Sequence, residues 1–93
     1  MTTRKSAWFV YLLRCNDNSL YAGVTTDIKR RVTEHNTSAL GAKYTRARRP
    51  VTLAYLEEAD SRSDAGKQEY KLRKLTKQKK EQKVASYLSK SED

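Results

Sequence analysis

The stretch that decides the fold is WFVYLLRCNDNSLYAGVT, residues 8–25. Aromatic and branched residues fill positions 8–14 and 20–25, and a polar, turn-forming cluster at 15–19 separates the two runs. Two such runs around a short polar cluster are typical of a β-hairpin. Side chains alternate between the two faces of a strand, and both faces of the first run are apolar. The first run is therefore predicted to be a central strand that is covered on both sides.

Beyond the hairpin, the chain predicts a helix, a third strand and two more helices. Thr26 or Asp27 can cap the first helix, and Ser61 or Ser63 can cap the second. Residues 51–56 have the composition of a strand. The other expected segments are a long basic loop over 36–50, a helix over about 64–75 and an amphipathic helix from about Thr76. We therefore expect an α+β fold, a small three-stranded antiparallel sheet flanked by helices, in the order β-β-α-β-α-α.

The helical period places several polar side chains on faces that should point inward. In the first helix, Arg31 and His35 share a face with the aliphatic pair Ile28 and Val32. In the second helix, Glu69 lies on the apolar stripe of Ala65 and Leu72. An inward carboxylate costs free energy unless it is paired or bound to a metal. The apolar residues expected to turn inward are Ile28 and Val32, then Ala65, Leu72 and Leu75, and finally Val84, Tyr87 and Leu88.

Length and charge narrow the possible functions. A chain of 93 residues has room for one core, so we expect a single domain over 1–93, with a core over about 8–84 and flexible tails. The formal net charge of +9 favours polyanionic partners, because Lys and Arg release counterions from each phosphate that they neutralise. Nucleic acid is the first candidate partner, and an anionic membrane surface is the second.

The cysteine and histidine content excludes several kinds of site. Cys15 is the only cysteine, so no internal disulfide can form, and no second thiolate is available to build a zinc site around His35. No apolar run approaches the roughly 18 residues that span a bilayer. We expect a cytoplasmic monomer that is neither exported nor embedded in a membrane.

Two tripeptides carry a resemblance to a known family. Phe9-Val10-Tyr11 and Tyr21-Ala22-Gly23, with nine residues between the tyrosines, resemble the paired signature of the GIY-YIG nucleases. Arg31, His35 and Glu69 occupy the downstream positions that this family uses. The resemblance covers about 8–84, and it is strongest to the small stand-alone members of the YhbQ type. The chain departs from the family at Phe9, where the signature has glycine, at Ala22, and in having no asparagine after Glu69.

The resemblance implies a nuclease that depends on a divalent metal and cleaves DNA with little sequence specificity, with a role in DNA repair or recombination. Glu69 would hold Mg²⁺ or Mn²⁺ at a single site. Tyr11 or Tyr21 would accept a proton from the attacking water, Arg31 would bind the phosphate, and His35 would assist the proton transfer. By the same resemblance Tyr44 would lie beside the active site, and the expected backbone contacts are Lys43, Tyr44, Arg46, Arg48 and Arg49.

Other interpretations of the same residues remain open at this point. Tyr11 and His35 can be buried residues whose polar atoms are satisfied by the backbone, and Arg31 can be a solvated helix arginine. Glu69 can form an ion pair with Arg31 instead of binding metal. A binding module with the same fold that does not cleave nucleic acid is the main alternative. A basic protein that associates with RNA or with a membrane surface, and whose tyrosines only fill the core, is the third.

Overall fold

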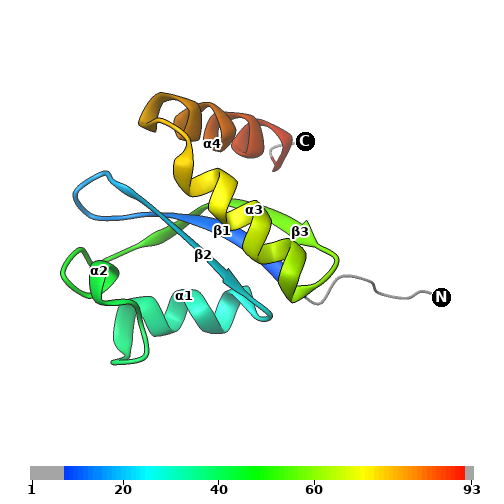
Figure 1. The fold of residues 1–93 in the computed structure, drawn as a ribbon. Helices are drawn as coiled ribbons and strands as arrows, with labels where there is room; N and C mark the ends of the chain where they lie inside the picture. Colours follow the sequence, from blue (N-terminus) through cyan, green and yellow to red (C-terminus); the bar gives the residue numbers. More distant parts are fainter. Residues whose placement is uncertain (1–7, 92–93) are drawn as a thin grey trace.

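The centre of the molecule is strand β1, Trp8–Arg14, in the computed structural model, which describes residues 8–91. Strand β2, Leu20–Thr25, and strand β3, Thr52–Ala59, pair with its two edges in antiparallel fashion, giving the order β2-β1-β3 (Figure 1). The prediction of a central strand is confirmed. The predicted N-terminal tail, 1–7, and the last two residues of the predicted C-terminal tail, 92–93, lie outside the described residues.

Four helices surround this sheet. They are α1 (Ile28–Thr37), α2 (Lys43–Arg46), α3 (Arg62–Lys74) and α4 (Lys77–Ser91). The order β-β-α-α-β-α-α adds one element to the prediction, because the short helix α2 lies within the segment expected to be a loop. Helix α4 also continues past 84, so the described part of the predicted C-terminal tail is helical. Figure 1 shows α1 and α2 on one side of the sheet and α3 and α4 on the other.

Side chains fix where three helices begin. The Asp27 carboxylate accepts from the backbone N–H of Arg30 at the start of α1, and the Ser61 hydroxyl does the same for Asp64 in α3. At α4 the hydroxyl of Thr76 accepts from a backbone N–H of the first turn. Each cap satisfies a donor that has no partner within its own helix.

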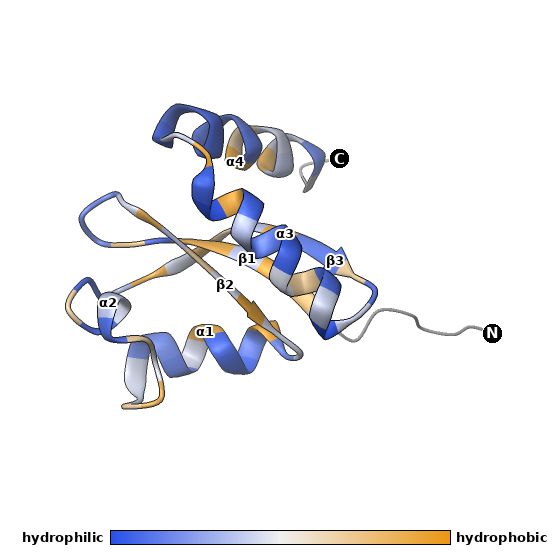
Figure 2. Cartoon of the chain, in the orientation of Figure 1, coloured by the Kyte–Doolittle hydropathy of each residue, from blue (hydrophilic) through white to orange (hydrophobic). Residues whose placement is uncertain are grey.

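The sheet separates two clusters of buried residues. Between the sheet and helices α3 and α4, the buried set is Val10, Leu12, Ala22, Ala54, Ala59, Ala65, Leu72 and Val84. Between the sheet and α1, it is Tyr11, Leu13, Cys15 and Val51, with Ile28 and Val32 packed against it. Figure 2 shows hydrophobic colours on the strands and hydrophilic colours over much of the outer helix surfaces. The inward prediction is confirmed for Val84, which is 3% exposed, and wrong for Leu88, which is 48% exposed near the end of α4.

Candidate functional site

Tyr11 lies at the centre of the candidate site. The residue is 1% exposed and belongs to the cluster beneath α1. Its hydroxyl oxygen lies 2.9 Å from Nε2 of His35. Opposite Tyr11 on β2 is Gly23, and a Cβ at that position would clash with the phenol ring and hydroxyl. A glycine inside a strand often marks a close approach by another group, and here that group is the phenol of Tyr11.

His35 links Tyr11 on the sheet to Thr45 in α2 through its two ring nitrogens. It is 0% exposed, and its Nδ1 lies 2.7 Å from the hydroxyl oxygen of Thr45, which is also 0% exposed. The Thr45 hydroxyl also lies within donating distance, 2.9 Å, of the carbonyl oxygen of Ala42. A Cβ at Gly41 would lie 2.8 Å from Cα of His35, so only glycine lets this loop cross the helix end so closely.

Burial controls the protonation of both groups. Burial raises the pKa of Tyr11, while a hydrogen bond from Arg31 acts in the opposite direction. Burial, followed by the positive charge of Arg31, lowers the pKa of His35 to about 4. At neutral pH the site therefore holds an uncharged phenol beside an uncharged imidazole, and the cation that acts most strongly on both is the guanidinium of Arg31.

Arg31 connects α1 to the loop that follows it. Its Nη1 donates to the Glu34 carboxylate at 2.8 Å and to the Leu40 carbonyl at 2.9 Å, and a quarter of its side chain is exposed. The ion pair that the sequence suggested as an alternative, between Arg31 and Glu69, is not formed. Arg31 pairs with Glu34 instead, because side chains three positions apart are neighbours on the surface of a helix.

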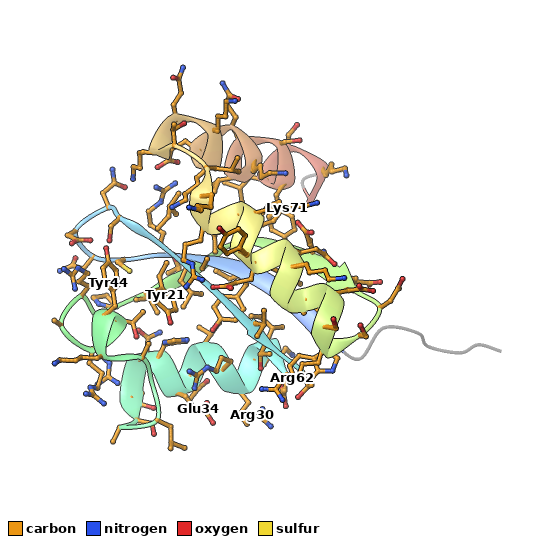
Figure 3. The ribbon with its side chains drawn as sticks, in the orientation of Figure 1. Tyr21, Arg30, Glu34, Tyr44, Arg62 and Lys71 are labelled. Carbon is orange, nitrogen blue, oxygen red and sulfur yellow. The ribbon has the colours of Figure 1, made fainter. Side chains whose placement is uncertain are left out.

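Tyr21 provides the more accessible phenol of the two signature tyrosines. It is half-buried, its ring meets the His35 imidazole edge-on at 5.5 Å between centroids, and it stacks on Tyr44 at 5.6 Å (Figure 3). The guanidinium of Arg48 lies 3.8 Å from the Tyr44 ring centre, and its Nε donates to the Asp17 carboxylate at 3.0 Å. These contacts, which join the hairpin to α2, hold Tyr44 beside the site.

The other predicted backbone contacts differ in their surroundings. Lys43 and Arg46 are exposed, and Arg46 donates to the Ala39 carbonyl. Arg49 is half-buried: it donates from Nε to the His35 carbonyl and from Nη2 to the Ser38 carbonyl, each at 2.6 Å. These bonds satisfy carbonyls at the C-terminal end of α1, so Arg49 has a structural role. Nucleic-acid contact by these residues stays a prediction.

Glu69, the predicted metal ligand, belongs to a different helix from Arg31 and His35. It lies on α3, its side chain is 17% exposed, and its ion-pair partner within residues 8–91 is Arg73, at 3.3 Å. Over the same residues no group of three or more His, Cys, Asp or Glu side chains is placed to hold a metal ion. Mg²⁺ is often held by one or two carboxylates together with substrate phosphate and water. The residues therefore fit a cation shared between Glu69 and a bound phosphate, and they do not form a complete protein cage.

Thr45 and Glu34 are the site residues that the sequence did not single out. Glu34 could have been found from its position three residues after Arg31. Thr45 gave no such signal, because it belongs to a short helix inside a segment without clear periodicity. Its role depends on the fold of the loop around Gly41, which only the three-dimensional structure shows.

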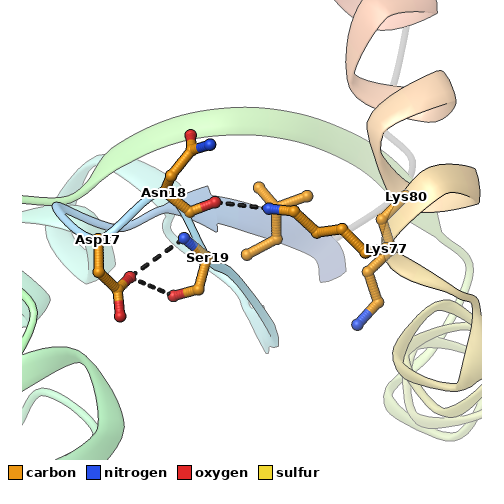
Figure 4. Close-up of a pocket in the computed structure, with 6 residues that line it drawn as sticks. Asp17, Asn18, Ser19, Lys77 and Lys80 are labelled. Atoms are coloured by element: carbon orange, nitrogen blue, oxygen red, sulfur yellow. Dashed lines mark hydrogen bonds between the residues drawn. The ribbon is translucent and has the colours of Figure 1, made fainter.

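A second depression lies away from this site, between the hairpin turn and the start of α4. Asp17, Asn18, Ser19, Leu20, Lys77 and Lys80 line it (Figure 4). Lys77 donates to the Asn18 carbonyl and pairs with Glu81, which also pairs with Arg14. These contacts fasten α4 to the hairpin. None of the helices in the described part of the chain is long and apolar enough to cross a membrane.

Comparison with known proteins agrees with this architecture. The model of the GIY-YIG catalytic domain matches residues 7–82. A UPF0213 protein of Desulfotalea psychrophila is 55% identical over 74 residues, covering 80% of this chain and 67% of that protein. A UPF0213 protein of Cronobacter sakazakii is 48% identical over 82 residues, covering 88% of this chain and 85% of that protein.

Solved structures agree as well. The solution NMR structure of the protein EF2693 from E. faecalis has a TM-score of 0.57 and 44% sequence identity, covering 94% of this chain and 91% of that one. The solution NMR structure of the UPF0213 protein BH0048 from Bacillus halodurans has a TM-score of 0.53 at 44% identity, covering 84% of this chain and 82% of that one. The order of strands and helices, the paired tyrosines and these similarities show that the chain belongs to the GIY-YIG family, together with the small UPF0213 proteins.

Proposed function

We propose that this protein is a divalent-metal-dependent nuclease that hydrolyses phosphodiester bonds in DNA. The observation that carries the proposal is the buried chain formed by Tyr11, His35 and Thr45, with Arg31 beside it. Burying two titratable rings next to a guanidinium costs desolvation free energy that an apolar core would avoid. Such an arrangement is typical of sites that transfer protons.

The phenol and the imidazole together can accept the proton of an attacking water. A phenol alone is a poor base at neutral pH, since its ordinary pKa is about 10 and burial raises that of Tyr11 further. If Tyr11 passes its own proton to Nε2 of His35 as it takes one from water, the phenol need not accumulate negative charge. The 2.9 Å separation permits this transfer. The water oxygen bonds to phosphorus, and the bond to the leaving oxygen breaks.

Arg31 couples this proton transfer to substrate binding. Its charge is the second cause, after burial, of the low pKa of His35. A phosphate bound to Arg31 would offset that charge, so the imidazole would become a better proton acceptor when substrate is present. The same guanidinium would stabilise the negative charge that grows on the phosphate oxygens in the transition state. Tyr21, the half-buried phenol, would also contact the phosphate.

Glu69 is the residue that would hold Mg²⁺ or Mn²⁺. When bound, the metal supplies Lewis-acid polarisation of a phosphate oxygen. The exposed Lys43 and Arg46, with Arg48 at the edge of the site, would track the nucleic-acid backbone through contacts that weaken as salt rises. A role in DNA repair or recombination follows from the family resemblance.

A nucleic-acid-binding module without cleavage is the second candidate. The ion pair between Glu69 and Arg73 favours it, because a carboxylate held by a neighbouring guanidinium must release that partner before it can bind a cation. This candidate predicts binding that falls with salt and does not respond to a chelator or to the loss of Glu69.

One assay separates the two candidates. Wild type, Glu69→Gln and Tyr11→Phe are incubated with supercoiled, branched and single-stranded DNA and with RNA, with Mg²⁺, Mn²⁺ or EDTA. The nuclease proposal predicts metal-dependent cleavage that Glu69→Gln abolishes and that Tyr11→Phe slows by about 10²- to 10⁴-fold. Glu58→Gln, which removes an exposed carboxylate from β3, is the matched control and should cleave like wild type. Equal cleavage by wild type and Glu69→Gln would contradict the proposal.

A further inference from the structure

The protons of the buried chain can be distributed in two ways. The relevant groups are the Tyr11 hydroxyl, the two ring nitrogens of His35, the Thr45 hydroxyl and the backbone of Ala42. Oxygen and nitrogen positions alone do not fix a histidine tautomer, so it has to be inferred from which arrangement satisfies every donor and acceptor.

In the first arrangement Nδ1 of His35 carries the proton. It donates to the Thr45 oxygen at 2.7 Å, and the Thr45 hydroxyl donates to the Ala42 carbonyl at 2.9 Å. Nε2 then has a free lone pair, and the Tyr11 hydroxyl donates to it at 2.9 Å. Every hydroxyl proton in the chain has an acceptor.

In the second arrangement Nε2 of His35 carries the proton and donates to the Tyr11 oxygen. The Thr45 hydroxyl would then donate to Nδ1, at which the backbone N–H of Ala42 points from 3.4 Å in either arrangement. Among residues 8–91 the Tyr11 hydroxyl is paired with His35, and the nearby guanidinium of Arg31 can only donate, so the phenol would lose its acceptor in this buried place. A buried donor without an acceptor costs about 1–3 kcal/mol. A contact of 3.4 Å from Ala42 is too long to offset that cost.

We propose that Thr45 is a positioning residue for the nuclease site: through the Ala42 carbonyl it holds His35 as the Nδ1–H tautomer, which leaves Nε2 free to take the proton of Tyr11. This inference rests on the proposed function and adds a residue to it. Thr45 does not contact the reacting atoms. It acts by fixing which nitrogen faces the phenol, and by accepting the Nδ1 proton of the imidazolium that forms when His35 takes up a second proton.

This assignment gives the short helix α2 a role in positioning site residues. Thr45 is buried against His35, while its neighbour Tyr44 stacks on Tyr21. Consecutive residues of one helical turn thus contact two different groups of the site. The backbone N–H of Arg46 also donates to the Ala42 carbonyl, so the acceptor for the Thr45 hydroxyl is fixed by the helix itself.

The tautomer can be measured directly, because His35 is the only histidine in the chain. Imidazole ¹⁵N chemical shifts of uniformly labelled protein distinguish a protonated ring nitrogen from a bare one. Wild type should show protonated Nδ1 and bare Nε2, and Thr45→Ser, which keeps the hydroxyl, should show the same. In Thr45→Val, Nδ1 loses its acceptor while the N–H of Ala42 can still approach it, so the proton should move to Nε2. A wild-type spectrum with protonated Nε2 overturns the proposal, as does an unchanged tautomer in Thr45→Val.

Cleavage by the same variants tests the consequence. Thr45→Val should lower kcat by about 10- to 100-fold with little change in KM, as the loss of an orienting hydrogen bond behind a functional histidine does. Thr45→Ser should restore most of the rate, and Thr33→Val, the same change on the exposed face of α1, is the control. If Thr45→Val unfolds, the wild-type and Thr45→Ser spectra still decide the tautomer. If wild type cleaves nothing, the nuclease proposal fails, and the spectra still support or overturn the positioning role.

Discussion

The two faces of the sheet are built from different chemistry. The face beneath α3 and α4 buries only apolar side chains, from Val10 to Val84. The face beneath α1 buries a phenol, an imidazole and a threonine hydroxyl, contributed by Tyr11, His35 and Thr45. Because successive side chains of β1 point to opposite faces of the sheet, this strand contributes residues to both. One thin domain can therefore keep the apolar burial that stabilises it apart from the polar groups of its candidate site.

The largest expected effect on stability lies on the apolar face. Leu72→Ala removes a side chain that is 3% exposed and leaves a cavity, so unfolding should become easier by about 2–5 kcal/mol. Tyr11→Phe on the other face removes only a hydroxyl and should lower stability by about 1 kcal/mol, while reducing cleavage as described above. Urea unfolding of both variants checks the contrast. Similar losses of stability would show that the two faces are not energetically distinct.

The second effect is a pH dependence that belongs to the polar face. In the unfolded chain the pKa of His35 is near 6.5, and burial lowers it to about 4 in the folded protein. Between these values the unfolded state binds more protons. Stability should therefore fall as the pH drops from about 6.5 and level off below about 4, by up to about 3 kcal/mol. Urea unfolding across this range, in wild type and His35→Gln, checks it, since the variant should lack the step.

Glu81, on α4, gives a second pH dependence of stability, which can be compared with that of His35. The hydrogen bond from Arg14, aided by Lys77, lowers the pKa of its carboxyl to about 2. Its stabilisation is fully present above about 4.5 and disappears as the pH falls towards 2, a lower window than that of His35. A third of the Glu81 side chain is exposed, so solvent screening should keep the effect below about 1 kcal/mol. A Glu81→Gln variant that lost the step near pH 6 would contradict the assignment to His35.

The third prediction concerns the close contact between Gly23, on the edge strand β2, and the buried phenol of Tyr11. Gly23→Ala places a methyl group against the Tyr11 ring, and relief of that clash should cost about 1–3 kcal/mol. Because the ring must move, the hydrogen bond to His35 should weaken too, and the imidazole ¹⁵N signals should shift. Gly66→Ala, at a helix position where a Cβ meets nothing within 4 Å, is the matched control and should be neutral or stabilising. Equal stability of the two variants would show that the phenol can move freely.

Local patterns predicted much of the fold. Alternation identified β1 as the middle strand, and side-chain oxygens at Asp27 and Ser61 were among the predicted helix caps. These features depend on residues close in sequence, and so periodicity and capping chemistry suffice. The helix α2 and the exposure of Leu88 were missed, because each depends on how a segment packs against distant elements.

The sequence predicted several residues that lie together in the candidate site, but it did not predict the contacts between them. The family signature named Tyr11, Arg31 and His35, and the structure connects all three. It did not name Thr45, whose hydroxyl meets His35 only because the loop passes the end of α1 at Gly41. The pairings of Arg31 and Glu69 were also undetermined, since several opposite charges were within reach of each in the sequence.

Trp8 gives the molecule a built-in optical reporter. It is the only tryptophan in the chain, and it packs half-buried against the apolar cluster, with the guanidinium of Arg62 5.9 Å from its ring centre. Its fluorescence should follow the apolar face during unfolding, whereas the imidazole signals of His35 follow the polar face. Two native probes, one on each side of β1, can therefore reveal without any label whether the two halves melt together or one before the other.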